Sequence, residues 1–402
     1  MSPEFTPVYG GVGAYATELL RHLPDEIDVH LVTVRREIQG MKDKECYSKK
    51  DDFRRNLSVH YLSSGSDTFF LYFLFQWACL RKLLNLHKKY QFDLFHTQFP
   101  VMPDLLVRLF RKTKIPTVCT VHSTVETQLA SIRRAKSQFS ELDRAEKANL
   151  LLFPPLKLCQ IFYLKEIQWF ITVSEFIRRR LIENYGFLDE KRIFTIHHGV
   201  DTKRYSPATN RNGPPMIEKS NGPIVLFTGR FVAKKGPHVL IRAIPKVLEH
   251  NPDAYFVFAG GGDFDPYIKL IKQSKIPEER YQYLGYVDSS DMAKLYNLAS
   301  VYVAPSFEDS LGIRILEAMS CEKAVVASKV GGVPEIIHSG QNGLLSTSGD
   351  SDELAEKIVM LLEDDGLRKR LAKAGRQTVL DRFSVTRMAR QTATLYDKIL
   401  CN

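Results

Sequence analysis

The stretch "SPATNRNGPPMIEKSNGPIVLFTG" (206–229) joins two different kinds of sequence. Its first part, 206–222, is dominated by Pro, Gly, Asn and Ser, shows no hydrophobic periodicity and indicates a linker. Its last part, "PIVLFTG" (223–229), is a nearly continuous apolar run that ends in a turn, which is typical of a strand buried on both faces of a sheet. The stretch therefore indicates two folded parts and a parallel sheet in the second.

Short apolar runs alternate with helical patterns on both sides of the linker. The further predicted strands are 27–34, 92–98, 117–122, 169–174, 192–199, 254–262, 281–287, 300–306 and 324–332. Helices are predicted between them, for example at 12–23 and at 175–186, where Ser174 stands in the N-cap position. This alternation predicts an α/β chain with two parallel sheets, each wrapped by helices, and a cleft between the two domains.

The composition is that of a globular chain with more than one core. A length of 402 residues indicates two domains, and 44% hydrophobic with 25% charged residues is close to average usage. The formal net charge of +10 indicates attraction to an anionic partner, such as nucleic acid, an acidic membrane surface or a phosphorylated small molecule. Composition does not choose among these partners.

Targeting and redox signals favour a soluble, cytoplasmic protein. The six cysteines are scattered without a CxxC pair or zinc spacing, so reduced thiols are expected. The opening "MSPEFTPVYGG" does not have the pattern of a signal peptide. The most apolar run, 69–80, is shorter than the roughly 20 residues that span a bilayer.

The turn after the strand 223–229 carries two cations. In "GRFVAKKG" (229–236), Arg230 and Lys235 follow the strand end a few residues apart, and ligands of open parallel sheets bind beyond such ends. Arg, with its planar fork, and Lys, with its point charge, suit a diphosphate. A solvated basic loop would contain the same residues.

The stretch "SFEDSLGIRILEAMSC" (306–321) holds three acids. Gly312 precedes a helical pattern, whose free N–H groups form an anion site that glycine lets a ligand approach. Glu317 lies too far into the helix to be explained by its dipole, and an acid there can accept both hydroxyls of a ribose. Glu308 and Asp309 are equally explained as acids that favour the helix dipole.

Glycines and a histidine give weaker signals. Gly331 and Gly332 follow the next strand, and "TPVYGGVGAY" (6–15) opens a helix; each permits close approach of a ligand or forms a plain turn. His122 ends a strand and would face the cleft, although a lone histidine is more often structural. The "DFD" motif at 263–265 is not expected to bind a metal, because two carboxylates alone make a poor site.

The segment 125–168 is long for a connection between strands. It has a basic, polar first part and an apolar second part, and helices broken at Pro154 and Pro155 are expected. We interpret it as an excursion that packs on the sheet. The alternative is an interfacial surface for a lipid acceptor.

Taken in order, these turns resemble those of the retaining glycosyltransferases of the GT-B fold, family four, the glycogen-synthase-like "glycosyl transferases group 1". The landmark sequences are "PEFTPVYGGVGAYATELL", "DLFHTQ", "TVHS", "ITVSEFIRRRL", "HHGVDTKRYSP", "LFTGRFVAKKG", "PSFEDSLGIRILEAM" and "GGVPEII". Any one of them is weak, whereas the ordered set covers nearly the whole chain and is specific.

The resemblance implies two Rossmann-like domains facing a cleft, with a nucleotide-diphosphate sugar bound mainly to the second and the acceptor docked on the first. It implies that Arg230 and Lys235 stabilise the departing diphosphate, with no metal or cofactor, and that Glu317 holds the ribose. The sugar would be transferred with retention by front-face attack, in which the leaving-group oxygen takes the acceptor proton.

The resemblance also implies roles for further residues. His122 would lie near the donor sugar. Counting back from Glu317 with seven intervening residues gives Asp309, so Asp309 would face the sugar hydroxyls, and Glu308 is interpreted as a solvated neighbour unless it swings in as a substitute. The other residues implied in donor binding are Gly10, Gly11, Gly229, Val287, Ser310, Leu311, Gly312 and Ile313.

The start of the chain departs from the family pattern. The family normally has a strand such as "KILMVS" directly before "PEF", whereas this chain begins "MSPEF". The missing strand would lie in the middle of the first sheet, and its loss would expose two unpaired edges. A mis-called start at Met1 or a trimmed chain is therefore expected, and the codons upstream of Met1 would test it.

The predicted domains are an acceptor-binding domain at 1–205, joined by a C-terminal helix at 386–402, a linker at 206–222 and a donor-binding domain at 223–385. The predicted function is transfer of a hexose from a nucleotide sugar to a glycan, a glycolipid or a small sugar, with peripheral contact with the inner face of the membrane and no nucleic-acid partner. Alternatives are a phosphorylase-like or epimerase-like relative, and a non-catalytic nucleotide-sugar binder inactivated by the missing strand and by Asp309.

Overall fold

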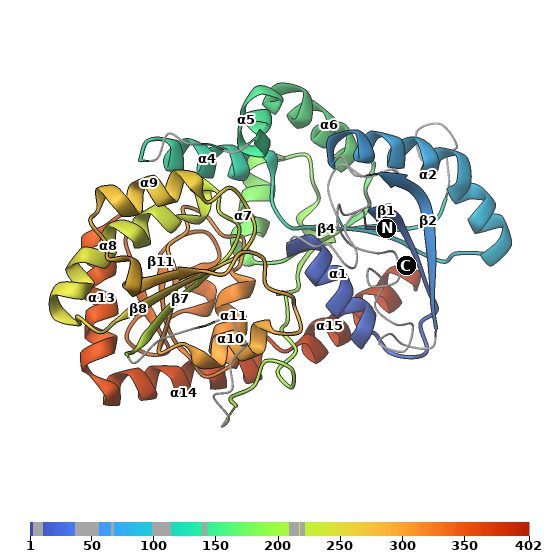
Figure 1. Cartoon of the computed structure of the whole chain (residues 1–402). Helices are drawn as coiled ribbons and strands as arrows, with labels where there is room; N and C mark the ends of the chain where they lie inside the picture. Colours follow the sequence, from blue (N-terminus) through green and yellow to red (C-terminus); the bar gives the residue numbers. More distant parts are fainter. Residues whose placement is uncertain are drawn as a thin grey trace. The chain divides into compact units, whose positions relative to one another are not determined.

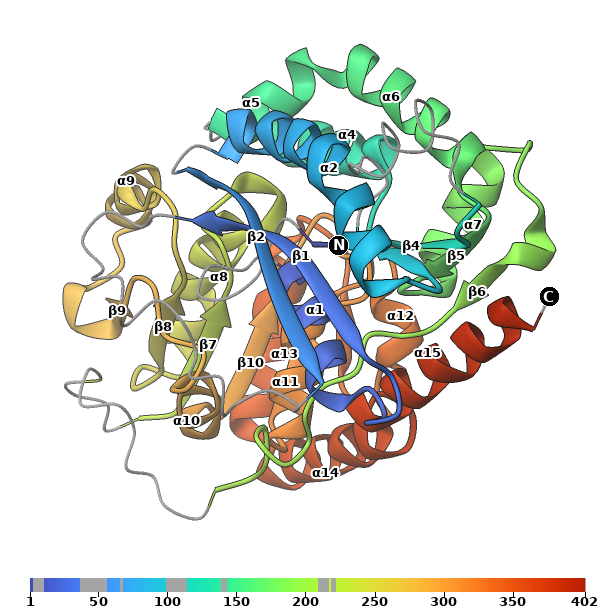
Figure 2. The same cartoon turned by 90° about the vertical axis from the view of Figure 1, so that its right-hand side faces the viewer.

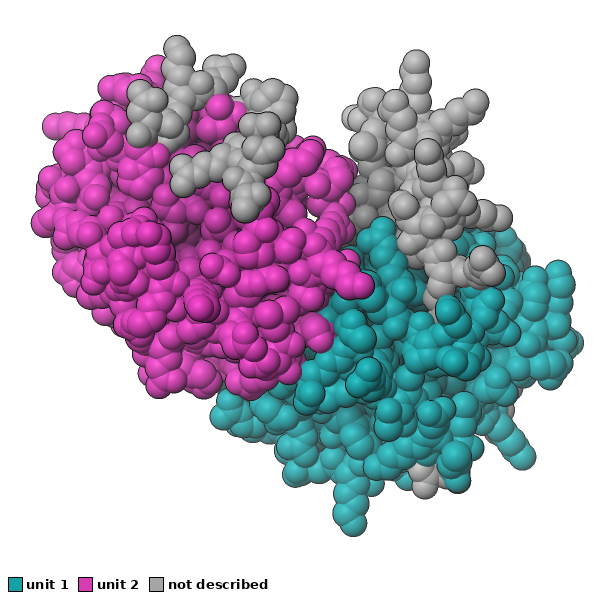
Figure 3. Space-filling view, turned by 90° about the horizontal axis from the view of Figure 1, so that it is seen from below, with its two compact units in different colours: residues 1–124, 154–199, 385–402 teal, residues 125–153, 200–384 magenta. Residues whose placement is uncertain are grey.

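The computed structural model describes residues 1–2, 11–36, 56–65, 68–98, 114–138, 142, 144–208, 217 and 222–401. The chain divides into two compact units, coloured teal and magenta in Figure 3. Unit 1 comprises 1–124, 154–199 and 385–402, and unit 2 comprises 125–153 and 200–384.

Unit 2 is built around a parallel sheet with the strand order β12-β11-β10-β7-β8-β9, of which Figure 1 labels β7, β8 and β11. Its strands are β7 (Ile224–Thr228), β8 (Tyr255–Ala259), β9 (Tyr281–Tyr283), β10 (Val301–Ala304), β11 (Ala324–Ser328) and β12 (Leu344–Ser346). The chain moves outward from β7 to β9, returns to β10 and moves outward the other way, which is the Rossmann order. The order reverses between β7 and β10, and ligands of such sheets bind beyond the strand ends at that point.

Helices cover both faces of this sheet. The helical elements of unit 2 are α4 (Val125–Lys136), α5 (Arg144–Leu151), η3 (Ala233–Lys235), α8 (Pro237–His250), α9 (Asp265–Gln273), η4 (Glu278–Arg280), α10 (Met292–Leu298), α11 (Ile313–Ser320), α12 (Val333–Ile336), α13 (Ser351–Glu363) and α14 (Asp365–Arg382). The core with α8, α9 and α13 is separate from the core with α10 and α11.

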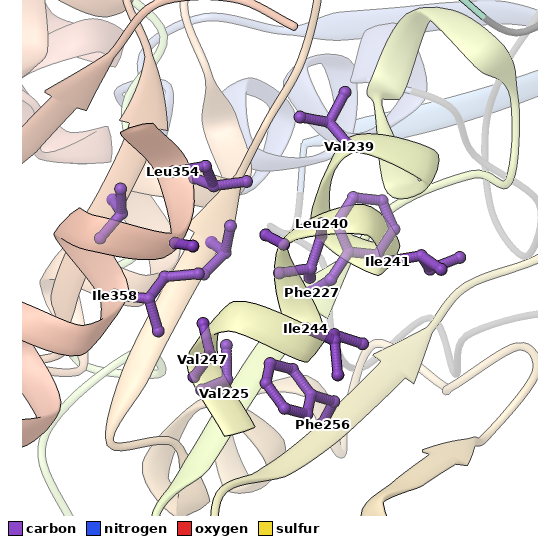
Figure 4. Packing of buried hydrophobic residues seen from close by; sticks show 14 of the residues in the cluster. Val225, Phe227, Val239, Leu240, Ile241, Ile244, Val247, Phe256, Leu354 and Ile358 are labelled. Atoms are coloured by element: carbon purple, nitrogen blue, oxygen red, sulfur yellow. The ribbon is translucent and has the colours of Figure 1, made fainter. Parts of the chain in front are cut away.

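Successive side chains of each strand point to opposite faces of the sheet and so belong to different cores. Val225 and Phe227 of β7 belong to the core with α8, whereas Leu226 belongs to the core with α11. On α8, Leu240, Ile244 and Val247 recur at helical spacing and are buried beside β7 (Figure 4). Because each fully buried aliphatic side chain contributes about 1.5–3 kcal/mol, these strands hold the turns that follow them firmly.

Unit 1 contains two parallel sheets among its described residues. One has the order β3 (Phe95–Thr97), β4 (Thr117–Val121), β5 (Trp169–Thr172), β6 (Ile193–Thr195), and the other pairs β1 (Val29–Arg36) with β2 (Leu57–Gly65). Its helical elements are α1 (Gly11–His22), α2 (Thr68–Tyr90), α6 (Phe153–Glu166), α7 (Glu175–Asn184), η2 (Glu190–Arg192) and α15 (Val385–Leu400). Figure 2 shows β1 and β2 from the side.

Residues 1–2 lie between the two sheets of unit 1. The Ser2 N–H donates to the carbonyl of Val32 in β1 at 3.1 Å, and the Gln98 N–H, just after β3, donates to the carbonyl of Met1 at 3.2 Å. Within the described residues, β1 and β3 are not paired with each other. The Met1 amino group also donates to the His96 carbonyl of β3, so the two residues link β1 and β3 at the place where a central strand was expected.

The predicted α/β class with parallel sheets is confirmed. Each predicted strand contains an observed one, except that β1 extends two residues beyond the predicted 27–34, and β2 and β12 were not predicted. The Ser174 side chain accepts from the Ile177 N–H and caps α7, as expected. Most of the predicted linker, at 209–216 and 218–221, lies outside the described residues.

The segment 125–168 differs from the expectation. It divides between the units, since 125–153 clusters with unit 2 although it was assigned to the domain 1–205. The helical break falls at Leu152, and Pro154 and Pro155 lie in the first turn of α6 rather than interrupting a helix. Proline fits this place because the first helical N–H groups have no partner within the helix.

Two further findings concern the whole set of described residues. None of their helices combines the length and the apolar character that crossing a bilayer requires. The five cysteines within the described ranges are free thiols.

Candidate active site

Two turns meet at the carboxyl ends of β7 and β10 in unit 2. The first runs from Gly229 through η3 to Gly236, and the second runs from Pro305 to Gly312. The Phe307 N–H donates to the Lys234 carbonyl at 2.9 Å. Gly236 has a φ of 71°, and a Cβ there would lie 1.9 Å from the Pro305 carbonyl oxygen. Glycine is therefore required for the two turns to approach this closely.

Lys235 and Asp309 form an ion pair across these turns. The Lys235 Nζ lies 2.7 Å from Asp309 Oδ2, and the two side chains remain 31% and 23% exposed. Such half-exposed pairs contribute little net stability, so the Lys235 ammonium can exchange its partner for an anionic ligand at small cost. The structure thus brings together two residues that the sequence placed in separate motifs.

The neighbouring pair, Lys234 and Glu308, faces α4 and α5. The Lys234 N–H donates to Glu146 Oε1 at 3.2 Å. Burial lowers the pKa of Lys234 to about 8, helped by the charges of Arg230 and Lys235. Arg230 itself is exposed, so its guanidinium adds positive charge to the turn while remaining accessible.

Glu308 is not the solvated neighbour that we expected. Burial raises the pKa of its carboxyl to about 7, against the opposing effects of Lys234 and of a hydrogen bond with Thr127. Thr127 lies on α4, far away in sequence, so no local pattern could reveal this burial. The structure corrects the prediction, and it separates Glu308, packed against α4, from Asp309, paired with Lys235.

Glu317 lies on α11 behind the second turn. Gly312 precedes this helix with a φ of 102°. The Glu317 side chain is only 6% exposed, and its carboxylate accepts from the Tyr296 hydroxyl at 2.7 Å and from Arg314 Nη1. A buried carboxylate needs such partners, and Glu317 has two donors in the structure.

A third turn, which follows β11 and contains Gly331 and Gly332, packs against the second turn. The Gly332 N–H donates to the Asp309 carbonyl at 2.9 Å, and a Cβ on Gly331 would lie 1.9 Å from that same oxygen. Close approach by these glycines is thus made to the protein's own backbone. Between Asp309 and α11, Ser310 is half-buried and Leu311 is buried.

The other predicted donor-binding positions fall in the same unit. Ile313 is the first residue of α11, and Gly229 ends β7, where its N–H donates to the Ala259 carbonyl at 2.9 Å. Val287 is buried two residues after Gly285, whose carbonyl accepts from the Gly260 N–H at 2.7 Å. These positions line up along the strand ends from β7 to β9.

His122 belongs to a polar network in unit 1. Its Nε2 lies 3.2 Å from Gln98 Oε1, and the Tyr15 ring meets it edge-on at 4.9 Å. The Gln98 amide also contacts His96 Nε2 at 3.2 Å, and Thr120 Oγ1 reaches that nitrogen at 2.7 Å. Burial lowers the pKa of His122 to about 3, so its imidazole is neutral at physiological pH and can either donate or accept one hydrogen bond.

The glycine-rich turn is only partly described. Gly11 begins α1, which carries the buried Tyr15. Gly10 lies outside the described residues. The "DFD" motif occupies an exposed turn, where Asp263 Oδ1 accepts from the Asp265 N–H at 3.0 Å at the start of α9.

Sequence reasoning missed the residues that support the predicted ones. Arg314 could have been found, because it stands three positions before Glu317 on one helix. Gln98 follows His96 at a strand end and carried a similar signal. Tyr296 and Glu146 had none, since tertiary packing alone brings them to the site.

Comparison with known proteins agrees with this geometry. Residues 9–204 match the family described as "Glycosyltransferase Family 4", and residues 214–378 match "Glycosyl transferases group 1". The phosphatidyl-myo-inositol mannosyltransferase of Mycobacterium leprae is 30% identical over 310 residues, which are 77% of this chain and 74% of that protein. The chain belongs to the family-four, group 1 glycosyltransferases.

Solved structures of other glycosyltransferases share the fold. Sucrose-phosphate synthase from Thermosynechococcus elongatus is 22% identical with a TM-score of 0.78, covering 99% of this chain and 95% of that one. The Anabaena protein HepE, solved with UDP and glucose, is 19% identical with a TM-score of 0.74, covering 98% of each. The fold of this glycosyltransferase is therefore GT-B.

The match to curated relatives does not extend over their whole length. In three further relatives the chain spans 64%, 69% and 62% of the other protein. The substrates of this glycosyltransferase are accordingly a matter for proposal.

Proposed function

We propose that this chain transfers a hexose, with retention, from a nucleotide-diphosphate sugar to a sugar-containing acceptor. The observation that carries the proposal is the Lys235–Asp309 pair, 2.7 Å apart, at the point where the strand order of unit 2 reverses. A cation and a carboxylate side by side suit the two parts of the donor: the leaving diphosphate and the hydroxyls of the sugar. The UDP bound to HepE supports the donor class.

The leaving group needs positive charge where its own charge develops. Lys235 and the exposed Arg230 lie on the same turn, and the first N–H groups of α11 follow Gly312. Fixed donors and cations at a leaving oxygen are among the largest contributions to catalysis. We propose that these groups neutralise the diphosphate and that no metal ion takes part, so that turnover should persist in the presence of EDTA.

The two motif acids would have separate roles. Glu317, deep in α11 and held by Tyr296, would accept the ribose hydroxyls, whereas Asp309, more exposed, would face the sugar. Glu317→Ala should therefore weaken binding of the nucleotide itself. Asp309→Ala should act mainly on turnover or sugar preference, and the division of roles fails if it weakens free-nucleotide binding equally.

The acceptor would dock on unit 1, near His122. A glycan, a glycolipid or a small sugar fits the family. The name of the Mycobacterium leprae relative specifies a lipid-linked inositol for that protein, which supports a lipid-linked acceptor and a peripheral contact with the inner membrane face. A neutral His122, oriented by Gln98, could hydrogen-bond a sugar hydroxyl without introducing charge.

Release of nucleoside diphosphate tests the proposal directly. We expect the chain to release it from at least one nucleotide sugar, and Arg230→Ala and Lys235→Ala each to lower turnover strongly, because each removes a charge from the leaving group. Circular dichroism should show that both variants stay folded. Rates equal to wild type in both variants would refute the site.

One observation favours a second candidate, a non-catalytic nucleotide-sugar binder. In the structure Asp309, which would face the sugar, is engaged by the Lys235 ammonium at 2.7 Å. A binder would show thermal stabilisation by nucleotide sugars without releasing diphosphate from any of them. The same panel of nucleotide sugars in both assays separates the two candidates.

A further inference from the structure

Glu317 is engaged by a neighbour that the sequence did not mark as part of the site. Arg314 Nη1 lies 3.1 Å from Glu317 Oε1 and 2.8 Å from Oε2. The two residues are three positions apart on α11, so their side chains lie on the same face. Their exposure differs, however: the Arg314 side chain is 47% exposed and the Glu317 side chain only 6%.

Most acceptor positions of the Glu317 carboxylate are occupied. An ionised carboxylate has about four lone-pair positions, two on each oxygen. Oε2 accepts from both Tyr296 and Arg314, and Oε1 accepts from Arg314. A ribose diol presents two hydroxyl donors, one for each oxygen. Bidentate binding of the diol is therefore incompatible with all three present contacts.

Tyr296 is not the partner that would leave. Its hydroxyl is fully buried, and it also contacts Thr228 Oγ1 at 3.0 Å, which in turn contacts the buried Tyr302 hydroxyl at 3.1 Å. Withdrawing the Tyr296 hydroxyl from Glu317 would break a fully buried hydrogen bond to a carboxylate, which is costly. Tyr296 thus acts as a positioning residue that fixes the carboxylate.

Arg314 is the partner that can leave. Its side chain is 47% exposed, so water can solvate the guanidinium once it moves away, although the Glu317 carboxylate attracts it and raises the pKa of Arg314 well above its usual range. Because Glu317 is buried, its carboxylate needs replacement donors when Arg314 leaves, and the two ribose hydroxyls supply them. The Arg314 guanidinium and a diol thus compete for the same two oxygens, and only the guanidinium has an alternative.

We propose that Arg314 sets the preference of this chain for a ribonucleotide over its 2′-deoxy counterpart, because its guanidinium competes with the ribose diol for Glu317. The inference rests on the proposed function, in which Glu317 is the ribose ligand. Occupation of Glu317 by Arg314 weakens the preference for a ribonucleotide over its 2′-deoxy counterpart. Removal of the guanidinium frees Oε1 fully and leaves Oε2 with the Tyr296 bond alone.

The test is a comparison of two ligands in two proteins. Dissociation constants for UDP and 2′-deoxy-UDP, and for GDP and 2′-deoxy-GDP, are measured by calorimetry with the full chain and with Arg314→Met. Methionine keeps an apolar stem in place of the guanidinium. The two members of each ligand pair share base and diphosphate, so the loss of one positive charge near the phosphates cancels in their ratio.

We expect Arg314→Met to raise the ratio of the 2′-deoxy to the ribo dissociation constant by roughly tenfold, the factor of one charge-assisted hydrogen bond. Arg314→Lys keeps a cation within reach of Glu317 and should stay near the wild-type ratio. Arg280→Met, which removes an arginine paired with Asp253 at 3.5 Å elsewhere in unit 2, is the matched control and should leave the ratio unchanged.

An unchanged or lowered ratio in Arg314→Met overturns the inference, because Arg314 would then assist ribose binding or be indifferent to it. The proposed function survives that outcome as long as the wild-type chain binds the nucleotides and Glu317→Ala lowers its affinity for them. If no protein binds any of the four nucleotides, the proposed function fails, and this inference fails with it.

Discussion

Lys234 and Lys235 are sequence neighbours with different surroundings, and so are Glu308 and Asp309. Lys235 pairs with Asp309, and both side chains stay partly exposed. Lys234 and Glu308 turn toward α4, where burial dominates the pKa of each and moves both toward neutrality. Successive residues of η3 and of the turn after β10 thus point in different directions. One pair is available to a ligand, and the other ties the turns to the helix.

The pKa of Glu308 predicts a specific dependence of stability on pH. The carboxyl titrates near its usual value of 4.5 in the unfolded chain and at about 7 in the fold. Between these values the folded state holds the proton more tightly, so folding stability falls as pH rises from about 4.5 to 7. Glu308→Gln should remove this penalty, and the variant should gain about 1–3 kcal/mol relative to wild type between pH 5 and pH 7.5.

Urea unfolding at the two pH values measures this gain. Several groups face Glu308 and titrate or carry charge in their own right: Lys234, Arg134 and Asp309. Comparing the two proteins at the same pH largely cancels their effects. Glu249→Gln, on an exposed part of α8 in the same unit, is the control. An equal difference in stability at pH 5 and pH 7.5 would show that Glu308 is solvated after all.

At the scale of elements, α4 and α5 act as a support for the turn after β7. They lie outside the sheet of unit 2, yet α4 packs on η3 and Glu146 of α5 accepts the Lys234 N–H. The Arg242 Nη2 of α8 also donates to the Gln138 carbonyl, just past α4, at 3.0 Å. The segment 125–153 therefore holds in place the residues from which Lys235 projects.

Glu146→Ala tests this support. It leaves a partly buried backbone N–H without its acceptor, so we expect a loss of about 1–2 kcal/mol in unfolding free energy and a higher KM for the donor sugar. Glu146→Gln keeps an acceptor and should behave almost as wild type. Glu353→Ala is matched, since Glu353 Oε2 also accepts one backbone N–H, that of Thr347, at 2.7 Å away from the site; it should leave KM unchanged. A normal KM in Glu146→Ala would limit α5 to a structural role.

Elements with a strong local pattern were predictable, and those formed by tertiary contacts were not. The central strands of unit 2, β7, β8, β10 and β11, are mostly apolar because both faces are buried, and of the six strands all but β12 were expected. The missed β2, "LSVHYLSSG", mixes His and Ser into an alternating strand that is only half-buried. At the candidate site, the sequence predicted that Lys235, Asp309 and Glu317 lie on turns and helices that follow strand ends, whereas the contact of Glu308 with Thr127 on α4 could not be read locally.

At the scale of the whole molecule, the two units differ in the continuity of their sheets. Unit 2 has six strands in one uninterrupted parallel sheet with a core on each face. The described part of unit 1 has a four-stranded and a two-stranded sheet, with residues 1–2 hydrogen-bonded between them. Shorter ladders bury less and open more readily. Because the described ladders of unit 1 are the shorter ones, we expect unit 1 to open before unit 2.

Thermal unfolding should therefore occur in two steps, with unit 1 melting first. Most of the groups proposed to hold the nucleotide diphosphate, from Arg230 to Glu317, lie in unit 2, whereas Gly10 and Gly11 belong to unit 1. A ligand stabilises only the part that binds it, so UDP or GDP should raise the upper calorimetric transition and leave the lower one in place. Hydrogen exchange should agree, with β7 and β10 protected far longer than β1. A single calorimetric transition whose temperature rises with added nucleotide would contradict this prediction. The two units would then unfold together.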